Sequence, residues 1–458
     1  GYPGVTFRHR MASEFANQID WQLPSRVALY QGMIDTIESA SAKDEAARVS
    51  YAAQVRSLKN TLKRAQGELD GLRRSDATKV RRDDETAMMA WLDKQADAAA
   101  IKADIAAAQA VLDRGVATRE RDQLLGVIAS QSQLLSSALT VQRLAHERGK
   151  PDAQRESGYQ QRDEVLITGK LKQVQRRYSP SVEKALLTDL LTQYQGLPAA
   201  QHVAEFDVVF GTTPAQLKAK LEAMYAGTRL RDDAQRLSAM QADRAALATS
   251  DDTLLKAAAA LLPAVLRLED ESKVSAGELL RLRPAYMKGL IAFRQSQGRA
   301  VYPDANSTLR VSYGRISAMD PRDGVHYQPL TTVQGITEKH TGAEPFNAPR
   351  PLLDAIAKGD FGSTAEPSLG NSSAGAQTVD FLTNLDTTGG NSGSPVLDAQ
   401  GKLIALNFDS NWEAVSASWM FDPRYKRAIH VDMRYMRWLM AKVYPAPHLL
   451  REMNLPAE

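Results

Sequence analysis

The sequence predicts an α+β fold in which a long all-helical region precedes a compact, mainly β region. Helical periodicity dominates up to about residue 297, strand-like alternation begins near residue 298, and a glycine-rich turn separates two predicted strands. A chain of 458 residues has room for two or three domains. We assign 1–20 to the end of one domain and a linker, 21–297 to a helical domain, and 298–458 to a β domain with a C-terminal helix.

The helical assignment depends on apolar spacing. After Pro24, Ser25 can cap a helix whose apolar residues then recur three and four positions apart. A clearer seam follows, with apolar residues alternating four and three apart over three heptads, as in a helix packed in an antiparallel bundle. Its members are Tyr51, Val55, Leu58, Leu62, Ala65, Leu69 and Leu72. Further helical patterns continue to about residue 268.

The β assignment depends on alternation and turn residues. Strands are expected over 308–314, 327–336, 378–385, 394–397 and 403–408, and the last two are joined by a turn that ends at Gly401. A final helix fits the spacing of Met433, Met436, Leu439 and Met440. The β region has the length of one six-stranded barrel and is too short for two.

Composition excludes several functions. The chain has 57 basic and 54 acidic residues, so its net charge of +3 gives no field suited to nucleic acid or anionic lipid. No apolar run reaches the ~18 residues of a membrane span, and we expect no membrane insertion. Cysteine is absent, so disulfides and thiolate–metal sites are excluded. We expect no metal and no cofactor.

The strongest chemical signal is the run from Thr387 to Val396, which contains Gly390-Asn391-Ser392-Gly393. A serine hydroxyl needs a base and N–H donors aimed at the oxyanion that its attack creates. The glycines permit a tight turn that aims the backbone N–H groups of Gly390 and Ser392 at one point. We therefore predict Ser392 as the nucleophile of a trypsin-like serine peptidase, with Gly390 and Ser392 as the oxyanion hole.

None of the seven histidines stands in a context that marks the catalytic base. His326 and His340 fall in or beside predicted strands, where ordinary structural roles are more common. Trypsin-like peptidases place their catalytic groups between two barrels, and only one is expected here. We therefore expect the base and its aspartate upstream of Gly1, and the isolated chain to be inactive.

Several runs give this region a family resemblance. The segment 388–396 resembles the bacterial dipeptidyl peptidases related to dipeptidyl aminopeptidase BII and dipeptidyl peptidases 7 and 11. The segments 302–314, 407–414 and 427–435 resemble the same family, and Gly1 to Gly4 resembles the end of its first barrel. The resemblance implies a helical domain inserted into a chymotrypsin-like double β-barrel. It also implies a homodimeric enzyme, periplasmic or surface-exposed in Gram-negative bacteria, that removes dipeptides from free peptide N-termini.

The resemblance also implies which residues bind the N-terminus of the substrate. A carboxylate and an amide would hold the substrate's ammonium group two residues from the cut bond. Asp409 fits the carboxylate and Asn60 the amide, although the residues alone equally describe a turn aspartate and a solvated helix asparagine. Ser410 is expected to line the pocket for the residue before the cut bond. Because it offers no positive charge, we expect an apolar or aromatic preference.

Two alternatives remain open. A glutamyl-type trypsin-like endopeptidase shares the serine motif, but it does not need some 270 helical residues. A non-catalytic helical interaction protein with a decayed barrel is the other, and the intact run around Ser392 argues against decay. Acetylation of a peptide's N-terminus abolishes cleavage by the exopeptidase and barely affects an endopeptidase.

Overall fold

The computed structural model describes residues 1–96, 98–366 and 376–455. The chain divides into two compact units. The first consists of Gly1–Pro24, Arg64–Thr86 and Ala300–Glu458, and the second of Ser25–Lys63 and Ala87–Arg299. The three segments expected from the sequence stay predictions. Residues 64–86 group with the β region, which the sequence did not indicate.

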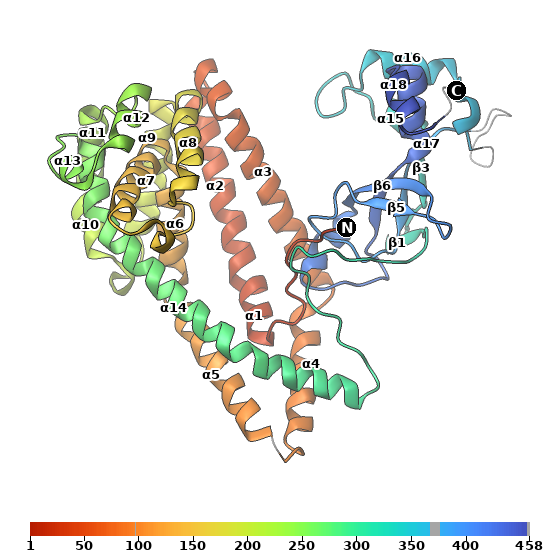
Figure 1. Ribbon diagram of the computed structural model, residues 1–458, viewed down its shortest axis with the longest axis horizontal. Helices are drawn as coiled ribbons and strands as arrows, with labels where there is room; N and C mark the ends of the chain where they lie inside the picture. The colour runs from red at the N-terminus through yellow and green to blue at the C-terminus, as the bar shows by residue number, and fades with distance from the viewer. Residues whose placement is uncertain (97, 367–375, 456–458) are drawn as a thin grey trace. The chain divides into compact units, whose positions relative to one another are not determined.

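Helices account for the whole chain from Ala12 to Ser296 apart from connections (Figure 1). Their bounds are α1 Ala12–Asn17, η1 Gln18–Gln22, α2 Leu23–Ser41, α3 Glu45–Arg74, α4 Ala77–Leu92, α5 Ala98–Val116, α6 Arg119–Gln131, α7 Gln133–Arg148, η2 Asp152–Gln154, η3 Gln161–Asp163, α8 Glu164–Arg177, α9 Pro180–Gln195, η4 Ala199–Gln201, α10 Ala204–Phe210, α11 Pro214–Gly227, α12 Asp233–Gln241, α13 Arg244–Ala248 and α14 Thr253–Ser296.

Local sequence explains where several of these helices begin. Ser132 caps α7 by accepting a hydrogen bond from the Leu135 N–H, and Thr213 caps α11 just before a proline at its first position. Asp252 caps α14 through the N–H groups of Leu254 and Leu255. Helix α14 then runs for 44 residues and passes through Pro263 and Pro284, and Figure 1 shows it lying beside α5.

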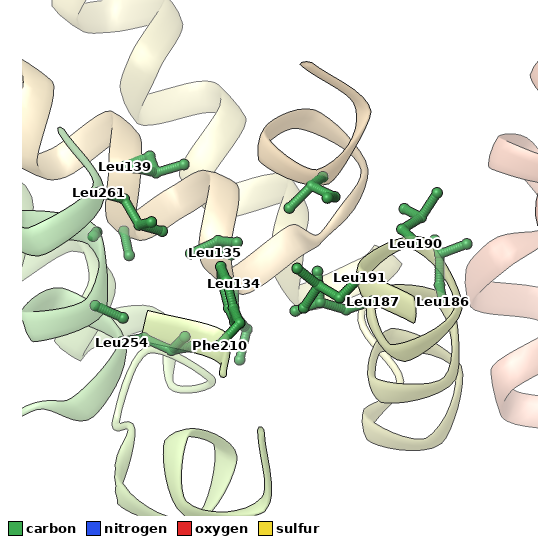
Figure 2. Packing of buried hydrophobic residues seen from close by; sticks show 14 of the residues in the cluster. Leu134, Leu135, Leu139, Leu186, Leu187, Leu190, Leu191, Phe210, Leu254 and Leu261 are labelled. Atoms are coloured by element: carbon green, nitrogen blue, oxygen red, sulfur yellow. The ribbon is translucent and has the colours of Figure 1, made fainter. Parts of the chain in front are cut away.

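The second unit has a leucine-rich core. Leucines of α7 and α9 belong to one buried cluster with Phe210 of α10 and Leu254 and Leu261 of α14, and Figure 2 labels these side chains. The predicted heptad seam is confirmed as a buried face: Tyr51, Leu58 and Leu62 belong to this core, and Ala65, Leu69 and Leu72 are buried farther along α3. Burial of this apolar surface, at about 25 cal/mol per Å², drives the packing of the helices.

The first unit contains the strands. They are β1 Met319–Arg322, β2 Val325–Tyr327, β3 Leu330–Thr332, β4 Thr378–Thr383, β5 Pro395–Leu397, β6 Leu403–Ser410 and β7 Ala428–Asp432. Strands β1 and β2 form a hairpin, and the other five form an antiparallel sheet in the order β3-β4-β7-β6-β5. The sheet places β5, which directly follows the glycine-rich turn, at one edge, and β6 lies beside it.

Helical elements complete the first unit. They are α15 Val333–Lys339, α16 Arg350–Lys358, η5 Gly362–Thr364, η7 Trp412–Ser418, α17 Met433–Trp438, η8 Leu439–Val443 and α18 Pro447–Glu452. Val333, Leu352, Trp438 and Val443 form a small core between them. The predicted C-terminal helix is present as α17 and η8, whereas α15 and α16 were not predicted.

Two predicted strands are wrong. Residues 308–314 form no strand in the described structure; instead the Arg310 N–H donates to the Gly1 carbonyl over 2.8 Å, and the Gly1 ammonium donates back to the Arg310 carbonyl. The predicted strand 327–336 is divided, because β3 ends at Thr332 and α15 begins at Val333. The alternation of apolar residues did not reveal that residue 310 binds the first residue of the chain, or that a helix begins at Val333.

Within the described residues no single helix is long and apolar enough to cross a membrane, although α6 and α7 together reach that level across a 94° bend.

Candidate active site

The turn before β5 holds its shape through two glycines and an asparagine. Gly390 and Gly393 have φ angles of +99° and +83°, which L side chains rarely adopt. Asn391 is buried, and its side-chain oxygen accepts a hydrogen bond from the Thr388 N–H over 3.1 Å. The Asn391 carbonyl accepts from the Ser394 N–H. This closed turn leaves Ser392 exposed at its tip.

The N-terminal segment supports the turn. The Gly4 N–H donates to the Gly389 carbonyl over 2.7 Å. A side chain at Gly390 would place its Cβ only 2.6 Å from the Gly4 nitrogen and 2.7 Å from the Tyr2 carbonyl oxygen. Only glycine fits there. The segment before the turn is fixed as well, because Arg8 binds both carboxylate oxygens of Asp386.

The structure supplies part of the environment that a serine nucleophile needs. Its hydroxyl donates to the Phe408 carbonyl over 3.0 Å. Within the described ranges, neither the Gly390 N–H nor the Ser392 N–H donates a hydrogen bond to another group. Two unengaged N–H groups on a tight turn are what an oxyanion hole provides. The roles of Ser392 and Gly390 stay predictions that this geometry fits.

No histidine of the described chain hydrogen-bonds the Ser392 hydroxyl. His326 is exposed and pairs with Asp320, while His340 accepts a hydrogen bond from the Ala348 N–H. His430 is fully buried in β7, where its Nε2 contacts the Thr383 hydroxyl over 2.6 Å. Burial lowers the pKa of His430 to about 4. The catalytic base therefore has no assigned residue.

A bulge in β6 positions the next two candidate residues. Asn407 pairs with His430 and Asp409 pairs with Ile429, so Phe408 is an extra residue that the ladder does not match. The bulge turns the Phe408 carbonyl toward Ser392. Asp409 is exposed, and its carboxylate accepts a hydrogen bond from the Ser410 N–H over 2.8 Å. Ser410 is half-buried opposite Ala428.

The structure thus brings Ser392, Gly390, Asp409 and Ser410 into one unit. Asn60 is exposed on α3, in the part of that helix that belongs to the second unit. Its role beside the substrate's amino group stays a prediction.

Gly67 of α3 is buried in the first unit, where an added Cβ would lie 3.2 Å from the Trp412 ring. The small residue serves close packing of α3 on η7.

An exposed serine with two unengaged N–H donors, on a turn beside the bulged strand of an antiparallel sheet, fits the nucleophile and oxyanion-hole part of a serine peptidase site. The family model for peptidase S46 matches residues 1–455. The chain belongs to the peptidase S46 family, and the resemblance seen in the sequence is confirmed.

Individual relatives give more detail. An Asp/Glu-specific dipeptidyl-peptidase of Shewanella putrefaciens is 36% identical over 99% of this chain and 64% of its own length. Dipeptidyl-peptidase 7 of Porphyromonas gingivalis is 27% identical over 99% of this chain and 62% of its own length. The crystal structure of Porphyromonas endodontalis DPP11 matches with a TM-score of 0.75 at 26% identity, covering 100% of this chain and 64% of that one. The chain therefore spans somewhat less than two thirds of these relatives.

The comparisons correct the functional prediction in two respects. The apolar or aromatic preference expected from Ser410 is wrong, because the relative at 36% identity is named Asp/Glu-specific. The lack of a positive charge at Ser410 was therefore not enough to predict the selectivity for the residue before the cut bond. The inference of an inactive fragment is withdrawn as well, because the dipeptidyl-peptidase match runs through 99% of the chain.

Proposed function

We propose that this protein is a serine dipeptidyl peptidase that releases dipeptides whose second residue is aspartate or glutamate. The observation that carries the proposal is the exposed Ser392 hydroxyl beside two unengaged N–H groups. Ser392 attacks the peptide carbonyl, and the N–H groups of Gly390 and Ser392 stabilise the oxyanion by roughly 3–4 kcal/mol per donor. The names of the relatives support the acidic preference.

Asp409 sets where the peptide is cut, because it binds the substrate's N-terminus two residues from the cut bond. Its exposed carboxylate, on the strand that lies next to the nucleophile, is suited to binding the substrate's ammonium group. A role for Asn60 in binding the same ammonium group rests on the family resemblance alone. A charged hydrogen bond of this kind disfavours blocked N-termini, which lack the positive charge.

The test uses four dipeptidyl coumarin amides: Leu-Asp, Leu-Asn, Leu-Phe and acetyl-Leu-Asp. We expect the Leu-Asp amide to be hydrolysed fastest and the acetylated one not at all. Cleavage of acetyl-Leu-Asp at the same rate would identify an endopeptidase of the glutamyl kind. No cleavage of any substrate by the full-length protein would leave the non-catalytic interaction protein as the better reading.

The wider family properties are part of the same proposal. These are the chymotrypsin-like double barrel with an inserted helical domain, the homodimer, and a periplasmic or surface location. The antiparallel sheet and the helical unit support the first of these. Light scattering of the purified protein tests the dimer, and a single-subunit mass at micromolar concentration would contradict it.

A further inference from the structure

Two buried polar atoms on strands β6 and β7 have no hydrogen-bond partner in the described chain. They are the Asn407 side-chain oxygen and the Nδ1 atom of His430. Asn407 is 5% exposed and His430 is 0% exposed. Burying an unpaired polar group costs about 1–3 kcal/mol, so such groups usually serve a ligand or an ordered water.

The two side chains lie next to one another. Asn407 of β6 and His430 of β7 are direct register partners in the antiparallel sheet. Residues in directly opposed positions share one face and have Cβ atoms about 4.5–5.5 Å apart. The two unpaired atoms therefore belong to one polar site and not to separate defects.

This site is attached to the nucleophile turn. The Asn407 carbonyl accepts from the Gly393 N–H over 2.7 Å, and the Asn407 N–H donates to the Ser394 carbonyl over 2.9 Å. Both bonds connect Asn407 to residues that directly follow Ser392. A group held by the Asn407 side chain would therefore lie close to the acyl carbon that Ser392 attacks.

The bulge brings Ser410 onto the same face. Asn407 pairs with His430, and Ser410 pairs with Ala428. Because His430 and Ala428 are two residues apart on one strand, they point to the same side. Asn407 and Ser410 do so too, although they are three residues apart. Ser410 was the predicted lining of the pocket for the residue before the cut bond.

The available hydrogens suit a carboxylate. When the Thr383 hydroxyl donates to Nε2 of His430, which lies 2.6 Å away, the proton of the neutral imidazole is on Nδ1. In the described chain Nδ1 has no acceptor for that proton. The Asn407 amide, turned by half a rotation, presents its NH₂ group to the same space.

We propose that Asn407 and His430 bind the acidic side chain of the residue before the cut bond, together with the Ser410 hydroxyl. The inference rests on the proposed function and names the residues behind its selectivity. Two or three neutral donors replace the cation that Ser410 does not supply. The carboxylate on the same face of β7, Asp432, does not oppose binding, because Thr378 and Arg434 already engage it.

The test compares a Leu-Asp amide with its uncharged isostere Leu-Asn, in the full-length protein. Asn407→Asp preserves shape but places a carboxylate against the substrate's carboxylate, and His430→Gln removes the imidazole donor. We expect each variant to lower the Asp/Asn ratio of kcat/KM by roughly 10- to 100-fold, the worth of a charge-assisted hydrogen bond. Turnover of Leu-Asn shows that each variant is folded.

His326→Gln is the matched control, because this histidine of β2 is exposed and its ring contacts Asp320. Lys426→Met tests a rival cation: its buried ammonium bonds the Ser416 hydroxyl and the Met420 carbonyl. If Lys426→Met lowered the Asp/Asn ratio of kcat/KM while the Asn407 and His430 variants did not, the proposal would be overturned.

An unchanged ratio in both Asn407→Asp and His430→Gln would overturn it too, and would assign the two atoms to a buried water. Failure of the proposed function would differ visibly, because the unmodified protein would then release no dipeptide from any substrate. If Asn407→Asp does not fold, the ratio in His430→Gln decides alone.

Discussion

The Ser392 hydroxyl donates a hydrogen bond to the Phe408 carbonyl over 3.0 Å. Phe408 is the extra residue of the β6 bulge, so its carbonyl is released from the sheet ladder and can face the turn. The hydroxyl of the proposed nucleophile is thus held in a defined orientation by a backbone carbonyl of a different segment, strand β6. In the reacting enzyme this bond would be exchanged for one to the base.

Replacement of Ser392 by alanine tests the nucleophile. We expect hydrolysis of Leu-Asp amides to fall by at least about 10⁴-fold, since the covalent route is lost while the fold is not. Fluorophosphonate labelling followed by mass spectrometry should mark Ser392 and no other serine. Ser394→Ala, in the same turn, serves as the control and should still be labelled. Labelling that persists in Ser392→Ala would show that the nucleophile is elsewhere.

Gly390→Ala tests the turn geometry. Its φ of +99° and the 2.6 Å approach to the Gly4 nitrogen leave no space for a Cβ. We expect a loss of about 1–3 kcal/mol of stability from the backbone strain, together with a displaced oxyanion hole. Thermal unfolding and kcat measure the two effects. Gly335→Ala, in an open position of α15, should lower neither the stability nor kcat. An unaltered Gly390→Ala protein would contradict the geometry.

The close packing of α3 on η7 predicts that an added side chain at Gly71 destabilises the first unit. A Cβ added at Gly71 would lie 2.9 Å from Cβ of Ser416. Gly71→Ala should therefore destabilise the first unit by about 1–3 kcal/mol, the usual effect of overpacking. Gly32→Ala, in an open position of α2, should instead be neutral or stabilising by up to about 1 kcal/mol. Equal melting temperatures for the two variants would be inconsistent with this contact.

Buried His430 predicts how stability depends on pH. Burial lowers the pKa of His430 to about 4, below the value near 6.5 of an unfolded chain. The unfolded state therefore binds the proton more readily, and this contribution is complete above pH 6.5 and declines as the pH falls toward 4. At about 1.4 kcal/mol per pKa unit, the decline reaches a few kcal/mol.

Calorimetry at pH 7.5, 6, 5 and 4.5 measures this decline. The His430→Gln variant, which cannot take up the proton, should show a shallower fall in melting temperature than the unmodified protein. His326→Gln should retain the full slope, because His326 is exposed. Parallel slopes for all three proteins would rule out His430 as the origin.

The sequence determined the features that neighbouring residues encode. The glycine-bordered turn at Ser392 could be read directly, since the residues that shape it lie within a few positions of one another. The heptad seam of α3 and the succession of helices followed from apolar spacing, because helical hydrogen bonds are local. The acidic preference could not be read from Ser410 alone.

Only the tertiary structure decided which distant segments meet. The β6 bulge pairs Asp409 with Ile429, 20 positions away, and Asn407 pairs with His430, 23 positions away. Gly390 contacts Gly4, 386 positions away. The strand predicted at 308–314 failed for the same reason, as its backbone bonds the first residues of the chain. Pairing across such separations depends on the packing of the whole sheet, and no local pattern records it.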